Sequence, residues 1–287
     1  MRNIKKVILF LFLFSIFSNS LYSQGNASDN FAISTNKVYQ SGVRILCEST
    51  IDKVKEYMAE SVVNDKNQVY SVGTGFIISI DGLIATAYHV VAPITKEIIV
   101  EHIINNQLKQ YIGTIVNYEK HADVALIKID VNNLPFVNLF DPINLSVERE
   151  IGFIGFPLLS PFSMVNKGII SAKADMPLLK NLENRHILIL NAFINHGNSG
   201  GPLYLSENGS VIGLINARKT TDVENLMIKL PPNYSPIMSI GGVDPITLSV
   251  ETYNKNLELI SDVTQLGIGY SASAEYIIKL REDYLKK

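Results

Sequence analysis

The sequence contains little cysteine, no long apolar run and no excess of positive charge. These shortages argue against an internal disulfide, a membrane-spanning helix and an anionic main partner. A single cysteine, Cys47, excludes a disulfide within the chain. The apolar run Val7–Phe17 has about eleven residues, whereas a helix that spans a bilayer needs about 20. Basic residues number 25 and acidic residues 27, so neither nucleic acid nor an anionic membrane is expected as the main partner.

Residues 1–23 have the pattern of a secretory signal peptide. Three basic residues precede the apolar run, and serines that suit a cleavage site follow it and end at Ser23. Without this segment the net charge is near −5, because the segment carries three basic residues and no acidic one. We therefore expect an exported chain, periplasmic or extracellular, that does not contact the membrane after signal-peptide removal. An uncleaved anchor is the alternative.

About 264 residues remain, which suits one large all-β domain or two small ones. Hydrophobic residues make up 47% of the chain, and the lack of a long low-complexity tract indicates a globular protein. Residues 24–42 are polar and are predicted to form a flexible arm. In the strand expected at residues 43–48, Cys47 shares a face with Val43 and Ile45, which predicts a buried structural thiol.

The most informative stretch is His196–Leu203, where glycines surround one serine. Strand-like runs precede and follow it, so Ser199 is expected on a tight loop between strands. A serine hydroxyl becomes a useful nucleophile only beside a general base, and backbone N–H groups must face the oxyanion that its attack creates. Glycines allow the backbone to turn those groups inward. A glycine-rich turn that merely joins two strands is the alternative.

The run Gly197–Leu203 resembles the nucleophile loop of the trypsin-like (chymotrypsin-fold) serine peptidases, and Asn198 before the serine is similar to the bacterial HtrA/Deg branch. The resemblance covers roughly residues 43–284. It implies an all-β fold of two antiparallel six-stranded barrels, and it implies neither a metal nor an organic cofactor. It also implies a histidine and an aspartate upstream of the serine, in that order.

His89 is the candidate for the histidine. It lies at the end of a hairpin that is expected to turn at Asp81-Gly82. The segment Gly73–Ile78 followed by Thr86–His89 is similar to the one that carries the general base in this family. An isolated histidine is more commonly a hydrogen-bonded core residue, and this is the alternative.

Asp123 is the candidate for the aspartate because it opens an apolar strand, where a carboxylate without a partner costs several kcal/mol. A histidine partner offsets that cost, and the strand resembles the Asp-hydrophobic-Ala-Leu strand of the family. Asp130 and Glu119 are the other acids considered, and His121 is interpreted as a surface neighbour. A turn residue at the strand end is the alternative.

The three candidates His89, Asp123 and Ser199 are 34 and 76 residues apart along the chain. This order fits a first barrel that supplies the histidine and the aspartate and a second that supplies the serine. It differs from the order of the same residues in α/β-hydrolases and in subtilisins. The resemblance assigns the oxyanion hole to the backbone amides of Gly197 and Ser199.

Turn signals between short strands predict the domain boundaries. The peptidase domain is expected at residues 43–287, with a first barrel at about 43–135 and a second at about 148–287. Residues 219–264, rich in proline and glycine and helical near 247–260, are predicted to be a mixed insertion beside the active-site cleft. A C-terminal helix is expected at residues 274–284.

The primary specificity pocket is expected beside the nucleophile, lined by Phe193, Ile194, Asn195, His196, Asn216, Ala217 and Arg218. None of these residues is acidic, so selection of lysine or arginine in the substrate is not expected. An apolar or small substrate side chain is the preferred hypothesis, and Arg218 leaves an acidic one as the alternative. His196 stands where the HtrA family usually has proline, and it is either a subsite residue or an exposed bystander.

Together these residues predict a serine endopeptidase that acts on polypeptides through an acyl-enzyme. Two other functions stay open: a trypsin-fold binding or scaffold protein without turnover, and an esterase that uses the same serine. The resemblance implies a trimer as one assembly. No PDZ domain of the kind that usually follows in HtrA proteins is expected after residue 284.

Overall fold

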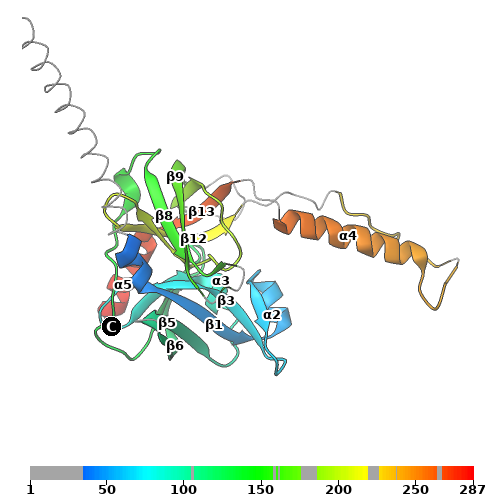
Figure 1. Ribbon diagram of the computed structural model, residues 1–287, viewed down its shortest axis with the longest axis horizontal. Coiled ribbons are helices and arrows are strands. Elements are labelled where there is room, and N and C mark those ends of the chain that lie inside the picture. The colour runs from blue at the N-terminus through cyan, green and yellow to red at the C-terminus, as the bar shows by residue number, and fades with distance from the viewer. Residues whose placement is uncertain are drawn as a thin grey trace, which may run out of the picture.

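The computed structural model describes residues 35–104, 107–157, 160, 162–175, 186–218, 226–236, 238–263 and 267–287. The predicted signal peptide lies outside these residues. The described chain forms two antiparallel β-barrels that pack against each other, and one long helix projects from them (Figure 1). The predicted all-β fold of two six-stranded barrels with a C-terminal helix is confirmed.

The first barrel has the strand order β1-β5-β6-β7-β4-β3-β2, and the pairing of β1 with β3 closes the ring. β2 pairs with β3 and lies outside the closed ring of six strands. Helices α2 and α3 follow β1 and β4. The bounds are β1 (Gly42–Ser49), α2 (Ile51–Glu56), β2 (Ser61–Val63), β3 (Val69–Ile77), β4 (Leu83–Ala87), α3 (Tyr88–Val91), β5 (Ile98–Ile104), β6 (Gln107–Glu119) and β7 (Val124–Lys128).

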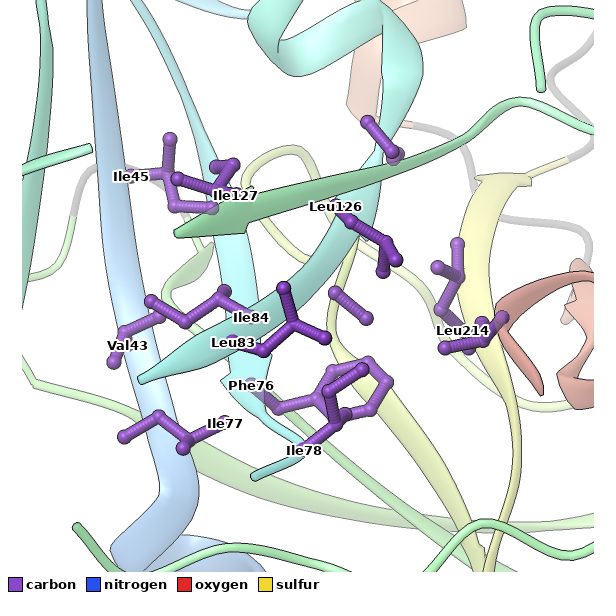
Figure 2. Close-up of a cluster of buried hydrophobic side chains, with 14 of the residues drawn as sticks. Val43, Ile45, Phe76, Ile77, Ile78, Leu83, Ile84, Leu126, Ile127 and Leu214 are labelled. Atoms are coloured by element: carbon purple, nitrogen blue, oxygen red, sulfur yellow. The ribbon is translucent and has the colours of Figure 1, made fainter. Parts of the chain in front are cut away.

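Alternate side chains of these strands point inward and fill the first barrel. Val43, Ile45 and Cys47 lie on one face of β1 and are fully buried, which confirms the predicted buried thiol. Figure 2 shows Val43 and Ile45 in one cluster with side chains from β3 and β7, among them Phe76 and Ile127. Burial raises the pKa of the Cys47 thiol to about 12, so the thiol stays protonated at neutral pH.

The second barrel closes from six antiparallel strands in the order β10-β13-β12-β11-β8-β9. Its interior is a separate cluster of buried side chains that includes Phe153 and Leu203. Each barrel therefore has a core of its own. The bounds are η1 (Pro142–Asn144), a 3-10 helix in the connection between the barrels, then β8 (Glu150–Gly155), β9 (Met164–Asp175), β10 (His186–Asn191), β11 (Pro202–Leu205), β12 (Val211–Arg218) and β13 (Ile268–Ser273).

Helix α5 (Ala274–Leu285) joins the two barrels after the last strand. The side chain of Ser273 caps its first turn. The helix contacts β6 and β7 of the first barrel and β12 of the second, and it buries Ile277 and Leu280. Asn117 Nδ2 in β6 also donates to the Leu280 carbonyl oxygen at 3.0 Å. These contacts hold the barrels together, which a site built from both of them requires.

Helix α4 (Pro245–Val263) extends away from both barrels (Figure 1). It begins two residues before the helical stretch expected from the sequence. Asp244 explains this start, because its carboxylate accepts a hydrogen bond from Thr247 N at 3.0 Å and the proline that follows it suits a first helical position. None of the described helices, α4 included, is long and apolar enough to cross a bilayer.

The segment before β1 is more structured than the polar sequence suggests. Residues 35–41, which lie within the predicted flexible arm, are helical. Val38 is fully buried, and Thr35 Oγ1 lies 3.0 Å from Tyr204 OH in the second barrel. The difference arises because one apolar side chain in this short segment packs into the core.

Candidate active site

The first barrel brings a histidine and an aspartate together at the ends of two paired strands. Ala87, the last residue of β4, lies opposite Val124, the first residue of β7. His89 follows β4 in helix α3, and Asp123 directly precedes β7. A backbone hydrogen bond of 3.1 Å from Tyr88 N to Asp123 O fixes the two segments side by side. The register of β4 and β7 therefore determines the position of both side chains.

Asp123 holds His89 through both carboxylate oxygens. Oδ2 lies 2.8 Å from His89 Nδ1, and Oδ1 accepts a hydrogen bond of 2.8 Å from His89 N. The backbone of Asp123 has a φ of 57°, a left-handed conformation that aspartate tolerates better than most residues. Because an ionised carboxylate only accepts hydrogen bonds, the neutral ring carries its proton on Nδ1. His89 Nε2 is then available to accept a proton.

The carboxylate also sets the protonation of His89. Burial alone lowers the pKa of the imidazole, because its charged form loses water. The Asp123 charge and hydrogen bond outweigh burial and raise the pKa of His89 above its ordinary value of 6.5. His89 is therefore a stronger base than a free histidine. Its imidazole also stays protonated up to a higher pH than that of a free histidine.

Ser199 lies on the loop between β10 and β11 of the second barrel. Its Oγ donates to Asn216 O at 3.3 Å, and its carbonyl oxygen accepts from Thr74 N of the first barrel at 2.8 Å. Among the contacts of the described residues, no hydrogen bond joins Ser199 Oγ to His89. Such bonds are often long without substrate and shorten when it binds.

Asn216 links the serine to the histidine–aspartate pair. Its backbone carbonyl accepts from Ser199 Oγ, while its side-chain Nδ2 donates to Asp123 Oδ2 at 3.2 Å and to Ala122 O at 3.3 Å. Its Oδ1 accepts from Ala272 N at 2.5 Å. The side-chain amide is therefore held at both ends, and it gives the Asp123 carboxylate a further donor.

The loop around Ser199 leaves two backbone donors unpaired. Gly197 and Gly200 have φ values of 87° and 84°, a region that favours glycine. A Cβ on Gly197 would collide with the carbonyl oxygen of Phe156. In the part of the chain that the structure describes, the amides of Gly197 and Ser199 donate no hydrogen bond. Two unpaired donors this close along the chain can bind one anionic oxygen.

The residues expected to line the specificity pocket differ in their surroundings. Phe193 is 63% exposed, whereas Ile194 is buried beside Gly269. The backbone oxygen of Asn195 accepts from Asn198 N at 3.2 Å. The side chain of Asn216 points to Asp123, as described above. Of the three remaining candidates, His196 is described next, and the side chains of Ala217 and Arg218 lie outside the described part of the chain.

His196, in the loop that carries Ser199, contacts the first barrel. Its Nδ1 lies 2.5 Å from Oε2 of Glu60, and both side chains are partly exposed. Glu60 directly precedes β2, and its backbone oxygen accepts from Val72 N at 2.8 Å. Nothing in the local sequence pattern distinguishes Glu60 from other surface acids, so the sequence alone does not predict this contact.

Among the described residues, the other ionisable side chains that the sequence offered make no hydrogen bond or ion pair with His89. Glu119 Oε1 accepts from the backbone amide of His121 at 3.1 Å, and His121 is exposed. Asp130 is exposed and lies two residues beyond the end of β7. The structure therefore pairs His89 with Asp123 and connects Ser199 to that pair through Asn216.

Two antiparallel six-stranded barrels, with a histidine–aspartate pair on the first and a glycine-bracketed serine on the second, define the chymotrypsin-like peptidase architecture. A family model for the trypsin-like peptidase domain matches residues 73–214, which run from β3 to β12 and include all three of these residues. The chain belongs to the trypsin-like serine peptidases, on the HtrA branch.

Curated relatives agree with this assignment, and solved structures agree with the fold. A probable periplasmic serine endoprotease, DegP-like, of Pseudomonas putida (strain W619) is 40% identical over 149 residues, which cover 52% of this chain and 29% of that protein. The magnetosome formation protease MamE of Magnetospirillum gryphiswaldense is 30% identical over 212 residues, 73% of this chain and 27% of that protein. The chain thus spans less than a third of the length of these relatives.

Among solved structures, the HtrA-type protease AlgW with tripeptide has a similar fold. The TM-score is 0.59 at 21% sequence identity, and the match covers 88% of this chain and 62% of that one. A variant, AlgWS227A with tripeptide, matches with a TM-score of 0.58 at 20% identity.

Proposed function

We propose that this protein is an exported serine endopeptidase that hydrolyses polypeptides through Ser199, His89 and Asp123. The observation that carries the proposal is the pair of 2.8 Å hydrogen bonds between the Asp123 carboxylate and His89, one to Nδ1 and one to the backbone amide. A histidine oriented in this way, beside a serine on a glycine-rich loop, is the arrangement that activates a hydroxyl.

In the proposed first half of the reaction, Ser199 Oγ attacks the carbonyl carbon of the scissile peptide bond and gives its proton to His89 Nε2. The carbonyl oxygen becomes an oxyanion, which the amides of Gly197 and Ser199 bind. Each such donor is worth about 3 to 4 kcal/mol in the transition state. Asp123 stabilises the imidazolium that forms and keeps the ring oriented.

The intermediate then collapses to an acyl-enzyme. His89 returns the proton to the nitrogen of the leaving amine as the C–N bond breaks, and the first product departs. A water molecule next gives a proton to His89 and attacks the acyl carbon. The second tetrahedral intermediate releases the carboxylic acid product and restores the Ser199 hydroxyl. Each proton that His89 takes up is returned, so the enzyme ends in its starting state.

Export and specificity are further parts of the proposal. The signal-peptide pattern of residues 1–23 and the periplasmic description of DegP-like relatives support export to the periplasm or beyond. The predicted pocket residues include no acid, so we expect an apolar or small substrate side chain before the cleaved bond. A trimer is the assembly that the family resemblance implies.

Casein hydrolysis by the mature protein and by its Ser199→Ala variant tests the proposal, with fluorophosphonate labelling of both. The wild type should cleave and label, and the variant should lose both activities, by a factor that approaches about 10⁶ in turnover. Comparison with a simple ester substrate separates a peptidase from an esterase. A folded wild type that neither cleaves nor labels would contradict the proposal.

The second candidate is a trypsin-fold binding protein without turnover. The direction of the Ser199 hydroxyl favours it, because Oγ donates to Asn216 O and not to His89. In that case the folded wild type would bind polypeptides without cleaving them, and fluorophosphonate labelling would be absent.

A further inference from the structure

Thr74 is a fully buried residue of β3 whose side chain leaves the first barrel and contacts the second. Its Oγ1 donates to the carbonyl oxygen of Gly197 at 2.7 Å and accepts from Phe156 N at 3.0 Å. One hydroxyl therefore pairs with two backbone groups of the second barrel. Gly197 is part of the nucleophile loop, and Phe156 directly follows β8.

The backbone of Thr74 holds the same loop at a second point. Its amide donates to Ser199 O at 2.8 Å, so the two contacts fasten the loop on both sides of Asn198. The carbonyl oxygen of Thr74 is occupied as well, because Thr86 Oγ1 donates to it at 2.7 Å. Thr74 is thus fixed within its own barrel while it holds the loop of the other.

The hydrogen bond from Thr74 restrains Gly197, a residue whose backbone has little conformational restraint of its own. Glycine is free over most of φ and ψ, and Gly197 adopts a φ of 87°. Its carbonyl accepts from Thr74, and its amide is one of the two unpaired donors assigned to the proposed oxyanion hole. Fixing the carbonyl limits rotation of the whole residue, and so limits the direction of that amide.

We propose that Thr74 is a positioning residue, and that its hydroxyl keeps the Gly197 amide in the orientation that binds the oxyanion. The inference rests on the proposed peptidase function and concerns the same site. Thr74 touches neither the nucleophile's hydroxyl nor the imidazole, so it acts through the loop. Its loss should weaken stabilisation of the transition state and leave the His89–Asp123 pair unchanged.

Three substitutions separate the hydroxyl from the volume of the side chain. Thr74→Val keeps the branched shape but can neither donate to Gly197 nor accept from Phe156. Thr74→Ser keeps the hydroxyl and removes one methyl group. Thr74→Cys keeps the size of serine but offers only a weakly hydrogen-bonding thiol. Ser49→Ala is the control, because it removes a buried hydroxyl that donates to Pro93 O at 2.7 Å, within the first barrel.

Each variant would be assayed with fluorescein-labelled casein for kcat and KM, with a fluorophosphonate for its labelling rate, and for its thermal unfolding temperature. We expect Thr74→Val to lower kcat by about 10- to 100-fold, the range for a small misplacement of catalytic groups. KM and the pH midpoint of kcat should stay within about twofold and about 0.3 units of wild type. Thr74→Ser should restore most of the activity, and Ser49→Ala should keep all of it.

The outcomes distinguish failure of this inference from failure of the proposed function. An inactive wild type would refute the peptidase function itself. An active wild type with an equally active, folded Thr74→Val variant would overturn the role of Thr74. If the valine variant does not fold, the serine and cysteine variants decide: equal kcat values in both would overturn the inference, and a lower value in the cysteine variant would support it.

Discussion

Replacing Asp123 with asparagine changes one atom type and tests the centre of the proposed mechanism. Among the described residues, each group that hydrogen-bonds to the carboxylate is a donor: His89 N and Nδ1, and Asn216 Nδ2. An asparagine has only one oxygen to offer, so its NH₂ must face a donor in either orientation. The asparagine side chain would keep the volume of aspartate but could no longer accept a hydrogen bond from each of the three donors.

The substitution should invert the tautomer of His89. If the new NH₂ faces Nδ1, that nitrogen must become an acceptor, and the ring proton moves to Nε2. Nε2 can then no longer take a proton from Ser199. In a serine peptidase of known mechanism the equivalent change lowers kcat by about 10⁴-fold. That factor corresponds to about 5 kcal/mol of transition-state stabilisation, and we expect a loss of that order here.

The pH profile should move at the same time. The Asp123 charge and hydrogen bond raise the pKa of His89 in the wild type, and without them only burial remains, which lowers it. The acidic limb of the residual activity should therefore lie at a lower pH in Asp123→Asn than in the wild type. Casein hydrolysis between pH 5 and 9 measures both effects.

A matched control comes from the acid beyond the other end of β7. Asp130 is exposed beyond the end of β7, so Asp130→Asn should change neither kcat nor the pH midpoint. A loss below about tenfold in Asp123→Asn, far from the 10⁴-fold expected, would refute the assignment of Asp123. An equal loss in both variants would point to a general effect on folding.

Three further predictions follow from individual contacts. Wild-type activity should rise with pH with a midpoint above 6.5, because the neutral His89 is the base and its pKa is raised; a midpoint at or below 6.5 in the casein assay would contradict this. Cys47 should resist Ellman's reagent in the native protein and react in guanidinium, since burial raises its pKa to about 12; a native thiol that reacts at once would argue against the buried position. Gly200→Ala should lower the free energy of unfolding by about 1–3 kcal/mol more than Gly241→Ala, because both glycines have positive φ but only Gly200 is crowded by neighbouring atoms. Chemical denaturation of the two variants measures the difference, and equal effects would contradict the prediction.

The fold and the residues of the proposed triad were predictable because their signals are local. The alternation of apolar side chains defines the strands, and a glycine-rich run marks the loop of Ser199. Asp123 is conspicuous as an acid that opens an apolar strand. Each of these patterns fits within about ten residues, the range over which periodicity is informative.

Contacts between the barrels were not predictable in the same way. Thr74 and Gly197 are 123 residues apart, and Asn216 and Asp123 are 93 residues apart. One signal was present for Thr74: a hydroxyl between two glycines of a buried strand must find a hydrogen-bond partner. The sequence does not say where that partner lies. The helix at residues 35–41 was missed because a single buried valine, Val38, anchors an otherwise polar segment.

These long-range contacts make the site depend on how the two barrels pack. The first barrel holds the histidine and the aspartate, and the second holds the serine, so no strand of either barrel fixes all three. Thr74 and Asn216 are among the residues whose hydrogen bonds cross between the barrels at the site, and α5 adds contacts to both barrels elsewhere. A substitution that loosens the packing of α5, such as Leu280→Ala, should therefore lower kcat before it lowers the amount of folded protein, because misalignment by a fraction of an ångström already affects catalysis.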